Sequence, residues 1–231
     1  MMELIFDIGY NKGEFTNEAF KNFPKTKVIA VEANPNLCKV PNRENFTLLN
    51  NLVSDSDGES IDFFIEHTQN GISTASKEFM ENSRFTKGSK NLRVNSARWA
   101  KPIKVSSITI DKMIEEYGKP NLIKIDVEGY EYNVLKGLTS KVGDICFEWH
   151  EEEYHNLLKI VEHLKSIGYN QFGVIGWFDE GDVFDKVTFS SKGDPYLEYP
   201  KEFHTWEDLK MDRLINPERR INYGMFFCKM I

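Results

Sequence analysis

The chain has 231 residues, of which 36 are acidic and 29 are basic, so its formal charge at pH 7 is −7. This length lies between one and two typical domains, and a hydrophobic content of 40% argues against a disordered or fibrous chain. The net negative charge argues against a protein that binds a nucleic acid backbone through its overall charge.

The three cysteines are Cys38, Cys146 and Cys228, and they are too few and too scattered for a disulfide framework. We therefore expect reduced thiols in an intracellular protein. The first residues reach an acid, Glu3, before a signal-peptide core could form. No apolar run approaches the roughly 20 residues that a membrane span needs. These features predict a cytoplasmic protein without a membrane span.

The first half of the chain alternates strand and helix patterns. Apolar or β-branched runs that end in turn residues predict strands at 3–8, 27–32, 46–53 and 61–65. Between the first two runs, apolar residues at helical spacing predict a helix over 15–23, which Pro24 ends.

The same alternation continues in the second half. The strand patterns lie at 103–110, 121–127, 144–149, 169–175 and 222–230. The helical patterns lie at 111–117, 130–138 and 152–167.

Two long stretches interrupt this order, at about 69–102 and 176–220. The first is polar without a sustained period, and we expect a long insertion with one short helix. The second is polar and rich in aromatic residues. The remaining pattern predicts one α/β domain over residues 1–231, with a mostly parallel sheet and helices on both faces. The last two strands have no helix between them, so we expect them to pair antiparallel at one edge.

The turn after the first strand has features of a ligand site. Gly9 and Gly13 let the backbone approach a ligand closely, and a helix N-terminus follows them. A dinucleotide fingerprint would place a third glycine where Asn11 stands. Asp7 would repel a phosphate and attract a cationic group such as an ammonium or a sulfonium. The alternative is that Asp7 only caps the turn.

Two further acids follow strands at the same predicted sheet edge. Glu32 ends the second strand, about twenty residues after the glycine turn, where nucleotide sites place an acid on the ribose hydroxyls. Asp55 follows the third strand, where it could face an adenine amino group or serve as a plain turn residue.

The longest motif is Lys-Ile-Asp-Val-Glu-Gly-Tyr-Glu at residues 124–131, which ends a buried strand with Asp126 and Glu128. It accompanies Ile-Phe-Asp-Ile-Gly at 5–9, Val-Glu-Ala-Asn-Pro at 31–35 and Ile-Thr-Ile-Asp at 108–111. With these motifs, roughly residues 3–176 resemble the FkbM family of S-adenosylmethionine-dependent methyltransferases.

The resemblance implies a Rossmann-like class I methyltransferase sheet of seven strands, mostly parallel, with an antiparallel edge strand. It also implies a set of cofactor-binding residues. They are Asp7, Gly9, Asn11 and Gly13 on the methionine part, Glu32 on the ribose, Asp55 near the adenine, and Asp126 beside the sulfonium end. The family usually has Ala where Tyr10 stands and often Pro where Ala33 stands. Residues 71–75 stand where the family often has a serine-bearing loop, which we expect to cover the site.

Methyl transfer to oxygen requires an acceptor held close to the methyl group and a base that removes its proton. The candidate bases at the sheet edge are Glu128, Glu148 and His150. Glu148 and His150 alternate along one strand and therefore point to the same side. The alternative for His150 is a surface histidine at a helix start. The four side chains of Asp126, Glu128, Glu148 and His150 could also hold a divalent metal, but we do not expect one.

The sequence therefore predicts an S-adenosylmethionine-dependent methyltransferase that acts on a hydroxyl of a sugar, a glycan or another small acceptor. The aromatic-rich stretch 176–220 and the family resemblance favour a sugar. Three alternatives remain. They are a nicotinamide-dependent oxidoreductase on a similar sheet, a module that binds S-adenosylmethionine without catalysis, and a nucleic-acid methyltransferase, which the acidic balance disfavours.

Overall fold

A computed structural model of the chain describes residues 2–38, 43–67, 70–87, 99–177, 187–189, 199–209 and 223–229. Most of the predicted second insertion, 176–220, and residues 69 and 88–98 of the first, 69–102, lie outside these residues. The single-domain organisation remains a prediction.

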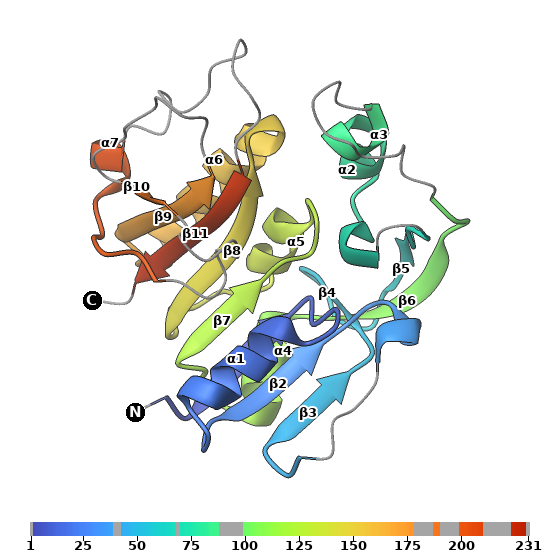
Figure 1. Ribbon diagram of the computed structural model, residues 1–231, viewed down its shortest axis with the longest axis horizontal. Coiled ribbons are helices and arrows are strands. Elements are labelled where there is room, and N and C mark those ends of the chain that lie inside the picture. Colours follow the sequence, from blue (N-terminus) through green and yellow to red (C-terminus); the bar gives the residue numbers. More distant parts are fainter. Residues whose placement is uncertain are drawn as a thin grey trace.

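The described residues form a large sheet whose strands run in the order β10-β9-β11-β8-β7-β1-β2-β3 (Figure 1). The strands are β1 Leu4–Ile8, β2 Lys27–Val31, β3 Phe46–Leu49, β7 Leu122–Ile125, β8 Asp144–His150, β9 Gln171–Trp177, β10 Val187–Phe189 and β11 Tyr223–Lys229. Only β11 among them is antiparallel, to both β8 and β9. The predicted mostly parallel sheet and the antiparallel pairing of the last two long strands are confirmed. β11 lies between β8 and β9, and the short β10 adds an eighth strand beside β9.

Alternating side chains of the central strands build a core on each face of the sheet, as a parallel sheet requires. On one face, Ile5, Val28 and Ala30 pack with Ala19 and Phe20 of helix α1, Glu14–Asn22. On the other face, the intervening residues pack with three helices. These are α4 Ile110–Tyr117, α5 Glu131–Lys136 and α6 Tyr154–Ser166. The predicted helical layers on both faces are thus confirmed.

A small second sheet corrects one predicted strand. The run 46–53 forms two strands, because the chain leaves the main sheet after β3 and enters the small sheet as β4, Leu52–Val53. The side-chain amide of Asn50 marks the change of direction by donating to the backbone oxygen of Glu32 at 2.8 Å. The other two strands of the small sheet are β5 Ser60–Phe63 and β6 Ile103–Ile108, in the order β4-β6-β5.

The predicted insertion contains more helix than expected. Residues 70–87, which we name the cover segment, hold η2 Asn70–Ile72, α2 Lys77–Asn82 and α3 Arg84–Lys87. The Ser76 hydroxyl begins α2 by accepting the backbone N–H of Phe79. In Figure 1, α2 and α3 lie beyond the carboxyl ends of the central strands.

The remaining short helices are η1 Pro35–Leu37, η3 Glu151–Glu153 and α7 Trp206–Leu209. None of the helices that the structure describes combines the length and the apolar character that a membrane crossing requires.

Candidate active site

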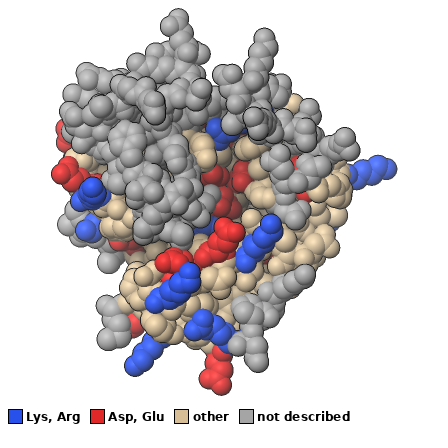
Figure 2. Space-filling view, viewed as in Figure 1, with Lys and Arg blue, Asp and Glu red and all other residues tan. Residues whose placement is uncertain are grey.

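A pocket opens at the carboxyl ends of β1, β2 and β7, where parallel sheets bind their ligands. Its lining comes from the strand ends, from the small sheet and from the cover segment. The lining residues used below are Gly9, Asn11, Val31, Glu32, Ala33, Asn51, Leu52, Phe63, Gly71, Ser73, Ala75, Asp126, Glu128 and Tyr130. Figure 2 shows acidic side chains inside the hollow at the centre of this face. The expected loop 71–75 does contribute to the cover of this pocket.

The turn between β1 and α1 has the backbone conformation that its glycines predicted. Gly9 and Gly13 have φ values of 82° and 77°, in the left-handed region that favours glycine. A Cβ at Gly9 would lie 1.8 Å from the backbone oxygen of Asp126, so no side chain fits there. Gly13 caps α1 and is not part of the pocket lining. It shapes the turn, whereas Gly9 and Asn11 face the pocket.

Asp7 lies below the turn and does not line the pocket. Its side chain is fully buried, and its Oδ2 accepts the Thr16 hydroxyl at 2.6 Å. Its Oδ1 is 3.3 Å from the Nζ of Lys124, its register partner on β7. Lys124 Nζ also donates to the backbone oxygen of Gly9 at 2.8 Å. Burial lowers the pKa of Lys124, but the Asp7 and Asp126 carboxylates outweigh burial and hold this pKa above its usual value. Asp7 thus supports the turn from beneath.

Glu32 presents its carboxylate to the pocket from the end of β2, and only 7% of the residue is exposed. Its Oε2 accepts the backbone N–H of Asn11, and its Oε1 accepts that of Asn34, both at 2.7 Å. Burial raises the pKa of Glu32, and the two amide hydrogen bonds offset part of that effect. Each carboxylate oxygen keeps a further lone pair, so the pair can accept two vicinal hydroxyls.

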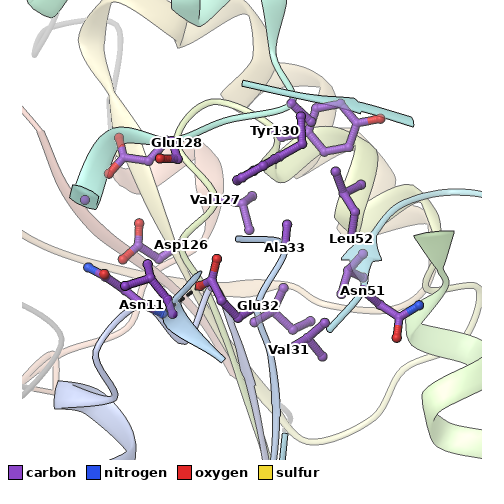
Figure 3. Close-up of a pocket in the computed structure, with 18 residues that line it drawn as sticks. Asn11, Val31, Glu32, Ala33, Asn51, Leu52, Asp126, Val127, Glu128 and Tyr130 are labelled. Atoms are coloured by element: carbon purple, nitrogen blue, oxygen red, sulfur yellow. Dashed lines mark hydrogen bonds between the residues drawn. The ribbon is translucent and has the colours of Figure 1, made fainter. Parts of the chain in front are cut away.

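The other half of the pocket is apolar. Figure 3 shows Leu52 and Tyr130 on the side opposite the carboxylates of Glu32, Asp126 and Glu128. Phe63 and Ala33 belong to the same apolar cluster as Leu52. A flat aromatic group fits such a surface. No local pattern in the sequence marked Leu52 or Tyr130 as lining residues, because they come from different elements that meet only in the fold.

Asp55, the predicted adenine contact, lies outside the pocket lining. Its carboxylate pairs with the ammonium group of Lys136, and this contact outweighs partial burial and holds the pKa of Asp55 below its usual value. Instead, the pocket is lined by Asn51 and Leu52, which precede Asp55 in the chain.

The turn after β7 directs Glu128 into the pocket. Glu128 has a φ of 55°, which is uncommon for a residue other than glycine, and Gly129 follows with a φ of 84°. The Thr74 hydroxyl of the cover segment donates to the backbone oxygen of Glu128 at 2.7 Å. The Glu131 carboxylate accepts the backbone N–H of Val127 at 3.0 Å. These two hydrogen bonds hold the turn from both sides.

Glu148 and His150 approach this turn from β8. As the strand period predicted, they lie on one side, with His150 Nε2 3.0 Å from Glu148 Oε2. Both residues are buried and neither is part of the pocket lining. Burial and the charges of Glu148 and Asp126 raise the pKa of Glu128 well above its usual value. Burial also acts to raise the pKa of Glu148, but contacts with His150 and Asp126 outweigh it and lower this pKa.

The described residues contain one group of side chains with the spacing of metal ligands. It consists of Glu128, Glu148 and His150, whose ligand atoms all lie within 4.8 Å of one another. Arg84 of the cover segment also enters this group, with its Nη2 2.5 Å from His150 Nδ1. The arrangement suits proton exchange between a ligand hydroxyl and Glu128, which alone of the three faces the pocket.

Comparisons with known proteins point to methyltransferases. Residues 7–170 match the family model described as the methyltransferase FkbM domain. Over 45 residues the chain is 42% identical to the hexuronic acid methyltransferase AglP of Haloferax volcanii. This alignment covers 19% of each protein, so it spans about a fifth of the curated relative.

Two solved structures share a distant likeness over the whole chain. The precorrin-6y C5,15-methyltransferase of Geobacter metallireducens is 13% identical, with 82% of that chain covered and a TM-score of 0.44. The plantazolicin methyltransferase BpumL, in complex with SAH, is 9% identical, with 77% covered and a TM-score of 0.42. Both likenesses are too distant to bear on the activity.

Proposed function

Because the chain belongs to the FkbM methyltransferase family, we propose that it transfers a methyl group from S-adenosylmethionine to a hydroxyl oxygen. The observation that carries the proposal is the pocket itself. The Glu32 carboxylate, which accepts two backbone N–H groups, lies between an apolar surface on one side and Asp126 and Glu128 on the other.

The pocket residues suit the parts of this cofactor. The Glu32 oxygens can accept the two ribose hydroxyls, and the surface of Leu52, Phe63 and Tyr130 can receive the adenine ring. The buried Oδ1 of Asn11 has no hydrogen-bond partner among the described residues, and it is an acceptor that an ammonium group would satisfy. Asp126, which also lines the pocket, supplies negative charge where a sulfonium would lie. S-Adenosylmethionine, when bound, provides an electrophilic methyl group on that sulfonium.

Glu128 is the residue that we propose as the proton acceptor. Its raised pKa makes it a stronger base than an ordinary glutamate, which favours removal of a hydroxyl proton. The turn of residues 126–129 also fixes its position, since Thr74 and Glu131 hold the backbone on both sides. The same fixed turn would keep the acceptor oxygen in line with the methyl group, which is a large part of the catalytic effect in such a displacement.

We propose a sugar or glycan hydroxyl as the acceptor. The partial match to a hexuronic acid methyltransferase and the aromatic-rich stretch 176–220 support this class.

The test is a transfer assay with methyl-labelled S-adenosylmethionine and a panel of neutral glycosides, uronides and simple alcohols. We expect a labelled methyl ether on at least one glycoside. Glu128→Gln should lower the rate by about 10²-fold or more while the cofactor affinity remains, because only the proton acceptor is lost. Glu162→Gln, an exposed carboxyl on α6, is the matched control. Cofactor binding without transfer to any acceptor would favour a non-catalytic module, and unchanged turnover in Glu128→Gln would remove the role of Glu128.

A further inference from the structure

Arg84 is a buried arginine of the cover segment that contacts the candidate base residues through a histidine. Only 7% of the residue is exposed. Its guanidinium Nη2 lies 2.5 Å from His150 Nδ1, and its guanidinium carbon lies 4.6 Å from the ring centre of Tyr223 on β11. The His150 ring stacks on the same Tyr223 ring, with 6.0 Å between centres and 18° between planes. Arg84 and His150 are therefore held together against one aromatic surface.

The contact with Arg84 determines where His150 carries its proton. A guanidinium group has five N–H donors and no acceptor, and it does not lose its proton in proteins. His150 Nδ1 must therefore accept a hydrogen bond from Arg84, which leaves the ring proton on Nε2. Nε2 lies 3.0 Å from Glu148 Oε2, so it donates to that carboxylate. A second proton on Nδ1 would place two donors against each other.

This order of donors has a consequence for Glu128. Glu148 accepts the Nε2–H of His150, and a hydrogen bond donated to a carboxylate favours its ionised form. The charged groups that face Glu128 are Glu148, Asp126, Glu131 and Arg84. An ionised Glu148 therefore contributes to the electrostatic environment that makes Glu128 a strong base.

We propose that Arg84 is a positioning residue that fixes the neutral Nε2–H form of His150 and, through His150, keeps the Glu148 carboxylate as the charged neighbour of Glu128. The role of Glu128 rests on the proposed function, but the position of the proton on His150 does not. The proposal also gives His150 a task other than general base, since both of its ring nitrogens are engaged. Because Nε2 carries the ring proton, it has no lone pair with which to bind a divalent cation.

The test is nitrogen-15 NMR of the histidine rings, which reports directly which ring nitrogen carries the proton. The chain has five histidines, and His150→Gln assigns the signal of His150. In the wild-type protein we expect a neutral Nε2–H ring that does not take up a second proton between about pH 5 and 8. A proton on Nδ1 would overturn the proposal, and it would leave Nε2 free to bind a divalent cation with Glu128 and Glu148.

Arg84→Met removes the donor and retains much of the side-chain volume. In this variant we expect His150 to take up a second proton within the same pH range, because Glu148 and Glu128 then face it without an opposing cation. Arg43→Met, at an exposed arginine over the Phe20 ring, is the matched control and should leave the His150 signal unchanged. A His150 signal that is the same in Arg84→Met and the wild type would refute the positioning role.

A loss of stability alone moves the unfolding midpoint and not the proton on a ring nitrogen, so the spectrum separates positioning from a structural role. If Arg84→Met does not fold, the wild-type tautomer still decides the question. The outcome is also independent of the proposed function. Failure to bind S-adenosylmethionine would refute that function and leave the His150 spectrum interpretable.

Discussion

Glu131 is a buried group for which the structure predicts a large effect of pH on stability. It is the first residue of α5, and its carboxylate accepts the backbone N–H of Val127 in the turn that carries Glu128. Burial, followed by the charges of Glu153 and Glu148, raises the pKa of Glu131 from 4.5 to about 8. We predict that Glu131→Gln stabilises the protein at alkaline pH, because the glutamine oxygen still accepts the Val127 N–H but carries no charge.

The direction and size follow from the two pKa values. Below about pH 4.5, Glu131 is protonated in both the folded and the unfolded chain, and its contribution to stability is complete. As pH rises, the unfolded chain loses this proton first, so the free energy of unfolding falls until the folded state also ionises at about pH 8. Each pH unit between the two values is worth about 1.4 kcal/mol, which gives a loss of up to about 5 kcal/mol.

The assay is urea unfolding of the wild type and Glu131→Gln at about pH 5 and about pH 8.5. We expect the variant to gain between about 2 and 5 kcal/mol relative to the wild type over this range, since Glu153 and Glu148 share part of the effect. Glu162→Gln on the exposed face of α6 should show the same difference from the wild type at both pH values. If the free energies of unfolding of Glu131→Gln and the wild type differ by the same amount at both pH values, the reasoning is refuted.

Three further predictions concern the cofactor and the base. Gly9→Ala should weaken S-adenosylmethionine binding by about 10-fold or more in calorimetry, because its Cβ would lie 1.8 Å from the backbone oxygen of Asp126; unchanged affinity would place the cofactor elsewhere. Asp55→Asn should leave this affinity within about twofold, since the Asp55 carboxylate pairs with Lys136 outside the pocket; a large loss would restore its predicted adenine contact. The transfer rate should rise with pH through the raised pKa of Glu128, because only the ionised carboxylate accepts a proton, and the same profile in Glu128→Gln would exclude it as the base.

The central fold could be predicted from the sequence because local patterns and tertiary structure agree there. β1 and β7 are short apolar runs that are nearly all buried, and turn residues end both. The division of 46–53 into β3 and β4 was missed, because it accompanies hydrogen bonds from Asn50 to the backbone oxygens of Glu32 and Ala33, just past β2, which no local pattern shows. The interior place of β11 was also missed, since no local feature shows between which strands the last strand inserts.

The candidate site was predictable where a residue directly follows a strand at the sheet edge. Glu32 and Asp126 follow β2 and β7, and both line the pocket. Asp7 stands within β1, and its register partner Lys124 holds it below the pocket surface. Arg84 could not be found from the sequence, because it lies in a stretch without a period and meets His150 across 66 positions.

Calorimetric titration of the wild-type protein with S-adenosylmethionine tests the central claim most directly. We predict one site with a dissociation constant in the range of about 1 to 100 μM. Glu32→Gln should weaken binding by about 10²-fold, because the carboxylate held by Asn11 and Asn34 would no longer receive the ribose. No heat of binding at about 1 mM ligand would contradict the assignment of this pocket and of the methyl donor.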